Sequence, residues 1–116
     1  MNKREKGSCY EDMAASFCID AGFELLEKNY RRKTGEIDLV MRDGVYLVFA
    51  EVKYRKKSRT GFPEEAVTYG KQQKIIRTAE WYLAEHRLPE DTPCRFDVIS
   101  ILDDKPELIR NAFGGF

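Results

Sequence analysis

Two carboxylates within the segment 35–55, Asp38 and Glu51, are spaced so that they could hold one cation between them, and Lys53 follows two residues after Glu51 on the same side of the strand. Two neighbouring carboxylates can hold a hard cation, and without a cation or a shared proton they would repel each other. The other interpretation is a Glu51–Lys53 ion pair on a solvated strand, and the spacing alone does not separate the two.

The segment that carries these residues is predicted to form a β-hairpin. Asp43-Gly44 favours a two-residue type I′ turn, because both central positions of that turn need a positive φ. Apolar residues alternate on both sides of the turn, as in half-buried strands. With this loop, Asp38 pairs with Phe49, and Asp38 and Glu51 become diagonal neighbours with Cα atoms about 7–8 Å apart.

Side chains alternate between the two faces of a strand, which divides this hairpin into a polar and an apolar face. Glu36, Asp38, Glu51 and Lys53 are predicted to project from the polar face. The other face must pack on a core, and it comprises Ile37, Leu39, Met41, Tyr46, Val48, Ala50 and Val52.

The composition indicates one soluble globular domain over residues 1–116. Of the residues, 42% are hydrophobic and 34% are charged, and the formal net charge is zero, so any nucleic-acid surface has to be local. Three cysteines without a CxxC pair, and a single histidine, argue against a zinc site and favour reduced thiols. No apolar run is long enough for a membrane span and no signal peptide is evident, so we expect a cytoplasmic protein without a membrane partner.

Two helices are expected around the hairpin. The first is predicted to begin at Ser8 and to end at Gly22, after a loose polar tail over residues 1–7. Ser8 and Glu11 fit a capping box; alternatively, Glu11 delivers a further carboxylate to the polar face of the hairpin. The apolar stripe of this helix comprises Tyr10, Met13, Ala14, Phe17, Cys18 and Ala21.

The second helix is predicted to begin near Thr68 or Gly70 and to run to about His86. Gln72 in its first turn either satisfies backbone groups or points toward the polar face, and the two interpretations have equal weight. Trp81 and Tyr82 are assigned to the core. The apolar stripe comprises Ile75, Ile76, Ala79, Tyr82 and Leu83.

Further strands are predicted over residues 23–32 and 95–102, a short helical turn over 64–67, and residues 108–113 could form a last edge strand. The order α-β-β-β-α-β favours an α/β fold with a single mixed β-sheet flanked by helices.

Basic residues cluster at both ends of the hairpin, although the total charge is balanced. Such runs are often solvated loops, but two of them beside an acidic face favour contacts with a polyanion through its phosphates. The clusters comprise Arg31, Arg32 and Lys33 before the hairpin, and Arg55, Lys56, Lys57 and Arg59 after it.

The chain resembles the YraN family of small bacterial proteins over about residues 10–113, in the motifs GEIDLV, EVKYR, KQQKIIRTAEWYL, RFDVI and IRNAF. That family resembles the restriction-endonuclease-like superfamily, close to the Holliday-junction resolvases. The superfamily motif, an Asp, a spacer and then Glu-x-Lys, maps onto Asp38, Glu51 and Lys53. A common Pro before the motif Asp is replaced here by Ile37.

The resemblance implies a restriction-endonuclease-like core and a Mg²⁺- or Mn²⁺-dependent endonuclease that cuts DNA, including branched DNA, without reading sequence. It implies that Asp38, Glu51 and the carbonyl of Val52 hold the metal, and that Lys53 orients water or stabilises charge. Gln72 would position water or phosphate, and Glu11 would be an outer or second-metal ligand. Glu36 is a reserve acid.

Two alternatives stay open at this stage. The chain could be a DNA-binding module with the nuclease fold and little catalysis, or a protein-interaction domain without a nucleic-acid role. Symmetric cutting of two strands would favour a homodimer.

Overall fold

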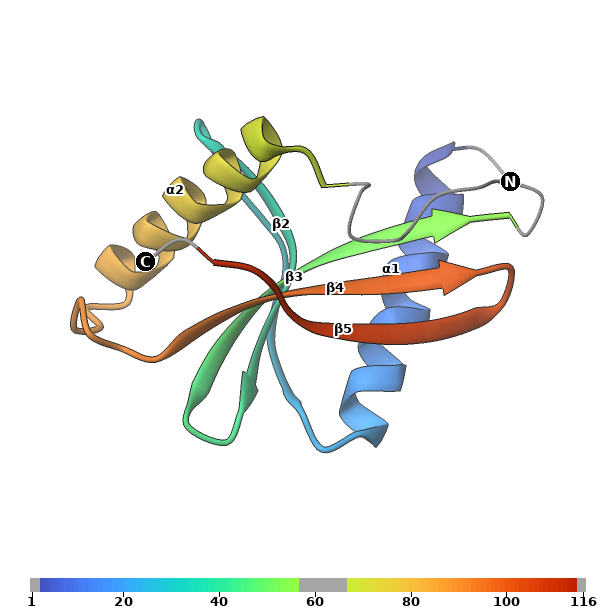
Figure 1. The fold of residues 1–116 in the computed structure, drawn as a ribbon, viewed down its shortest axis with the longest axis horizontal. Coiled ribbons are helices and arrows are strands. Elements are labelled where there is room, and N and C mark those ends of the chain that lie inside the picture. Colours follow the sequence, from blue (N-terminus) through green and yellow to red (C-terminus); the bar gives the residue numbers. More distant parts are fainter. Residues whose placement is uncertain (1–2, 57–66, 115–116) are drawn as a thin grey trace.

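The computed structural model describes residues 3–56 and 67–114, with side chains from residue 9 onward. Five strands form one mixed sheet in the order β1-β2-β3-β4-β5, accompanied by two helices, as the sequence predicts (Figure 1). The elements are α1 (Lys3–Asp20), β1 (Glu24–Arg32), β2 (Gly35–Asp43), β3 (Tyr46–Arg55), α2 (Tyr69–Glu85), β4 (Cys94–Leu102) and β5 (Lys105–Phe113). The helical turn predicted over 64–67 falls largely outside the described residues.

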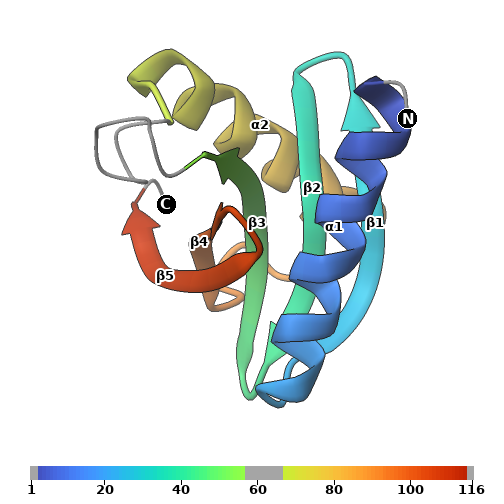
Figure 2. The same cartoon turned by 90° about the vertical axis from the view of Figure 1, so that its right-hand side faces the viewer.

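The two helices cover opposite faces of the sheet, with α1 on one side and α2 on the other (Figure 2). Strands β3 and β4 are parallel, and α2 lies in the crossover that connects them, because parallel neighbours cannot be joined by a tight turn. Alternate residues of β3 therefore enter different cores: Phe49 packs under α2 and Val48 under α1. Both faces of the hairpin are core, which corrects the prediction of one apolar and one polar face.

Helix α1 begins earlier than the sequence predicts. It starts at Lys3, so most of the predicted tail is helical and Ser8 and Glu11 are interior positions rather than a capping box. Its end is as expected: Gly22 has φ +100° and donates to the carbonyl of Ile19, while Phe23 donates to Cys18, the paired bonds of a Schellman motif. No helix among the described residues has the length and apolarity needed to cross a bilayer.

Helix α2 agrees with the prediction at both ends. Thr68 is the N-cap and accepts from the amide of Lys71 through its hydroxyl, and His86 is the C-cap. The whole predicted stripe is buried. Trp81 is a correction, because it is 51% exposed, whereas its neighbour Tyr82 lies in the core.

The turn of the central hairpin is one residue later than predicted. Asp43 pairs with Tyr46, so Gly44 and Val45 form the loop. Gly44 has φ +60° and Val45 is not among the residues with positive φ, which is the pattern of a type II′ turn, with glycine at its first central position. Phe49 consequently pairs with Val40, two residues from the predicted partner, and a shift of two preserves every side chain's face.

The alternation of side chains in β2 changes face at Asp38. Leu39 lies in the core under α1, but Ile37 lies in the core under α2, although side chains two apart should share a face. Their partners in β1 behave alike: Lys28 forms an ion pair with Asp12 of α1, and Tyr30 packs under α2. Between these partners Asn29 adopts φ +55°, a left-handed conformation that reverses the alternation and corrects the predicted placement of Ile37.

A buried ion-pair network ties β4 to its neighbours. Asp97 is fully buried and accepts from the guanidinium of Arg95 at 2.9 Å and from the amide of Asn111 at 2.9 Å. Arg95 also donates to Asp43 at 2.8 Å, at the end of β2. Each charge of the network is therefore compensated by a partner, as burial of a charge requires.

We expect Asp97→Ala to lower the free energy of unfolding by about 3–5 kcal/mol, because it leaves the Arg95 guanidinium without its buried partner. Urea unfolding followed by circular dichroism measures this change. The control is Asp91→Ala, at an exposed position, which should stay within about 0.5 kcal/mol of wild type. Equal effects of the two substitutions would contradict the assigned role of the network.

Candidate metal and phosphodiester site

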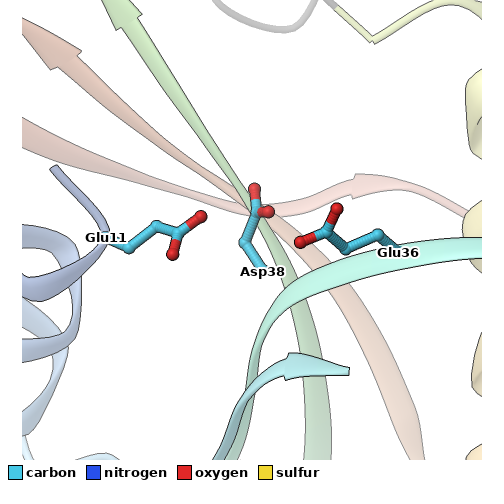
Figure 3. A group of neighbouring side chains, drawn as sticks. All are labelled: Glu11, Glu36 and Asp38. Carbon is cyan, nitrogen blue, oxygen red and sulfur yellow. The ribbon is translucent and has the colours of Figure 1, made fainter. Parts of the chain in front are cut away.

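Three carboxylates from two elements lie together where the ladder between β2 and β3 ends. Glu11 of α1 and Glu36 and Asp38 of β2 each offer an oxygen, and these oxygens all lie within 4.8 Å of one another (Figure 3). The change of face at Asp38 explains the meeting. It turns Glu36 toward α1 while Asp38 stays at the boundary between the two faces, so that a helical acid can reach both.

Asp38 is held by a backbone amide of the neighbouring strand. The ladder between β2 and β3 ends at the pair Leu39–Ala50, and the next step of the same register would set Asp38 opposite Glu51. Instead, the carboxylate of Asp38 accepts from the amide of Val52 at 2.8 Å. A side chain thus takes the place of a carbonyl of β2, and the two strands are joined here through a carboxylate.

The electrostatics of the acid cluster favour a proton or a cation. Burial raises the pKa of Asp38 to about 8, and the charge of Glu51 adds to the rise, against the lowering effect of the Val52 amide. Burial also raises the pKa of Glu11, and the charge of Glu36 acts in the same direction. Bringing these carboxylates together has a cost that a divalent cation would remove.

Glu51 lies beside this cluster and is bound by two lysines. Its side chain is 6% exposed, and its carboxylate lies 2.5 Å from the ammonium of Lys71 and 3.6 Å from that of Lys53. Burial lowers the pKa of Lys53, and the neighbouring Lys71 lowers it further. Burial also disfavours the charged form of Lys71, but the hydrogen bond to Glu51 outweighs it and raises the pKa of Lys71.

Carboxylates and lysines line a common hollow of about 140 Å³ between β2, β3 and the first turns of α2. The predicted acids Asp38 and Glu51 both line it, whereas Lys53 does not line it and lies 3.6 Å from the carboxylate of Glu51. Glu36, assigned only a reserve role, belongs to the site as well. The hollow is lined by Gly35, Glu36, Asp38, Glu51, Lys71, Lys74 and Ile75.

Gln72 does not line this hollow. Its amide nitrogen donates to the carbonyl of Val67 at 3.0 Å, which favours the backbone-satisfying interpretation. The sequence analysis missed Lys71, the residue before it. A side chain from the first turn of α2 could be expected to reach the strand that carries Glu51 and Lys53. Whether Lys71 or Gln72 does so depends on the phase of the helix, which the sequence does not give.

The described basic residues of the two predicted clusters differ in their contacts with other side chains. Arg31 and Lys33 are exposed, and Arg31 contacts Glu36 at 3.3 Å. Arg32 is engaged by Glu85 through two bonds of 2.7 Å and stacks on Tyr30, so it is the least suited to a phosphate. Of the second cluster, Arg55 is the last residue of β3 and Lys56 follows it, and Lys57 and Arg59 lie outside the described residues.

The donor set fits a hard divalent cation. Carboxylate oxygens on rigid elements are the ligands that Mg²⁺ and Mn²⁺ prefer, and Mg²⁺ commonly takes few protein ligands and completes its shell with water and phosphate oxygens. Val52 adds an expected donor, because the carbonyl of a strand residue faces the same neighbour as its amide, and that amide faces Asp38.

The comparisons with known proteins identify relatives along the whole chain. The model of a family described as "Uncharacterised protein family UPF0102" matches residues 10–101. A UPF0102 protein of Lachnoclostridium phytofermentans is 50% identical, over 100% of this chain and 98% of its own. A UPF0102 protein of Nitrosomonas europaea is 47% identical, over 93% and 92%, and one of Clostridioides difficile is 41% identical, over 97% and 100%.

We expect Asp38→Asn to stabilise the metal-free protein at alkaline pH. The pKa of Asp38 is about 8 in the folded state against an ordinary 3.8, so the folded state binds the extra proton and wild-type stability falls as the pH rises from about 4 to 8. Asparagine keeps an acceptor for the Val52 amide but cannot ionise. One pH unit of pKa difference corresponds to about 1.4 kcal/mol, so the variant should gain at least that much at pH 8.5.

Urea unfolding in EDTA at pH 4 and pH 8.5 tests this expectation. The two proteins should have similar stabilities at pH 4 and should separate at pH 8.5. Parallel pH profiles would show that Asp38 ionises normally in the folded state.

Proposed function

The chain belongs to the uncharacterised protein family UPF0102, the YraN family, and we propose that it is a divalent-metal-dependent nuclease that hydrolyses phosphodiester bonds of DNA. The observation that carries the proposal is the convergence of Glu11, Glu36 and Asp38 within 4.8 Å, beside the lysine-bound Glu51. Such a group places oxygen ligands for a metal beside ammonium groups, and both can stabilise the charge that develops during phosphodiester hydrolysis.

The three clustered carboxylates would hold Mg²⁺ or Mn²⁺, with Glu51 and the carbonyl of Val52 as neighbouring donors. When bound, the metal supplies a Lewis acid for a phosphate oxygen and lowers the pKa of a bound water. Glu11 comes from α1 and the other two acids from β2, so the site depends on the packing of the helix against the sheet.

Lys53 and Lys71 would act on the water and the phosphate. Because burial and Lys71 lower the pKa of Lys53, its neutral form is more accessible than that of an ordinary lysine, which suits a group that orients or deprotonates water. Lys71 keeps its charge through Glu51 and can face the negative charge that develops on phosphorus.

The surroundings favour cleavage without sequence readout. Arg31, Lys33 and Lys56 are exposed, and Arg31 contacts Glu36 of the acid cluster; these residues would contact backbone phosphates, which carry no sequence information. Both long helices of the described residues pack on the sheet by their apolar stripes, and neither is presented to a major groove. Structure-selective or non-specific cutting is therefore the expected activity.

A second candidate is a DNA-binding module with little catalysis, and one observation favours it. The carboxylate of Glu51 is already compensated by Lys71 at 2.5 Å and by Lys53, so this acid has less need of a cation. The two candidates differ in whether the acid cluster binds metal.

We expect Asp38→Asn and Lys53→Ala each to lower metal-dependent cleavage by at least about 100-fold, since each removes a group assigned to the chemistry. The assay follows labelled duplex, splayed and four-way-junction DNA in Mg²⁺ and in Mn²⁺. Asp91→Asn, an exposed acid in the loop after α2, should cut like wild type. Equal cutting by all four proteins would reveal a contaminating nuclease and remove the proposal.

Isothermal titration with Mn²⁺ separates the two candidate functions. We expect wild type to bind Mn²⁺, Glu11→Gln to bind it at least about ten-fold more weakly, and Asp91→Asn to bind it normally, because Glu11 is one of the three clustered ligands. DNA binding without any metal-dependent heat would favour the non-catalytic module.

A further inference from the structure

Trp81 is a large aromatic side chain that lies outside the two hydrophobic cores. It is the only tryptophan of the chain, and it is 51% exposed on α2. The buried side of that helix is formed by other residues, among them Ile75, Ala79 and Tyr82. The placement of Trp81 is therefore not explained by packing against the sheet.

Trp81 lies in a hollow next to the hollow of the acid cluster. It lines an open hollow together with Thr34, Arg77, Glu80 and Ala84. Thr34 belongs to the turn between β1 and β2 and directly precedes Gly35, which lines the hollow of the acid cluster. The two hollows are thus consecutive along one seam, where this turn meets α2.

The seam is tightly held, which fixes the two hollows relative to each other. The hydroxyls of Thr34 and Thr78 are 2.7 Å apart, joining the turn to the helix. At Gly35 an added Cβ would lie 3.3 Å from the side chains of Lys74 and Thr78, so the backbone of the turn approaches α2 closely at this residue.

Cationic side chains connect the acid cluster to Trp81. Lys71, Lys74 and Arg77 recur every three residues along α2; the first two line the acid hollow and the third lines the hollow of Trp81. At a rise of 1.5 Å per residue, Lys71 and Trp81 are about 15 Å apart along the helix axis. Glu80, the acid in the second hollow, offers an acceptor for the amino group of a base.

We propose that Trp81 stacks on a base of an unpaired DNA segment whose phosphates follow Lys74 and Arg77 from the acid cluster. A base inside a duplex is covered on both faces by its neighbours, whereas an unpaired base offers a free face to an aromatic ring. This inference rests on the proposed nuclease function and narrows its substrate to DNA with an unpaired stretch beside the cleaved bond.

The fluorescence of Trp81 can be used to detect its contact with a DNA base. In EDTA and low salt, we expect a 15-nucleotide oligo-dT to quench the tryptophan fluorescence, and a blunt duplex of equal length to bind without comparable quenching. Fluorescence anisotropy of labelled oligo-dT should show Trp81→Leu binding about ten-fold or more weakly than wild type, and Trp81→Phe should retain most of the affinity. The matched control, Tyr46→Leu, removes an exposed aromatic at the hairpin turn and should bind like wild type.

The outcomes distinguish this inference from the nuclease function. Binding of oligo-dT without quenching, equal affinities of wild type and Trp81→Leu, or no binding at all would overturn the stacking site. If the stacking site fails while metal-dependent cleavage persists, only the substrate assignment is lost. Quenching without cleavage in Mn²⁺ would keep an unpaired-base site and overturn the nuclease. If the inference is correct, Trp81→Leu lowers the rate of cleavage of splayed DNA more than that of blunt duplex DNA.

Discussion

The hydrogen bond from the Val52 amide to the carboxylate of Asp38 is the constraint on which the site depends. Two antiparallel strands normally satisfy each other through backbone groups, and a continued ladder would leave no opening between β2 and β3. Here a carboxylate replaces a carbonyl at the end of the ladder. The substitution keeps the Val52 amide paired after the backbone ladder has ended and places an acid between the two strands.

The left-handed conformation of Asn29 complements this bond. Because it reverses the alternation of β1 and β2, Ile37 can fill the core under α2 while Glu36 turns toward α1. A regular strand would have sent Ile37 and Leu39 to the same face. The irregularity at Asn29 therefore places an apolar residue in the core under α2 and an acid beside α1.

Much of this arrangement was predictable, and the failures have identifiable causes. The elements, their order and the buried stripe of α2 follow from periodicity and caps. The predicted hairpin register was wrong, since Gly44 fits either position of a tight turn, yet a shift of two residues preserves the faces, so Asp38, Glu51 and Lys53 still met. Ile37 was misplaced because alternation was assumed across Asp38 in β2, which lies opposite the left-handed Asn29 of β1, and Asn tolerates positive φ. Trp81 was assigned to the core because it is a large aromatic residue. Its position on α2 places it on the exposed side of the helix.

Helix α1 is both a cover for the sheet and a source of one ligand, and its small residues connect these two roles. Ala14 and Cys18 are fully buried, and with Ala15 they let the helix backbone approach the strands closely. A close approach is what a glutamate side chain needs to reach Asp38 from a helix. The distance between helix and sheet, set by packing several residues away from Glu11, therefore determines whether three acids share one cation.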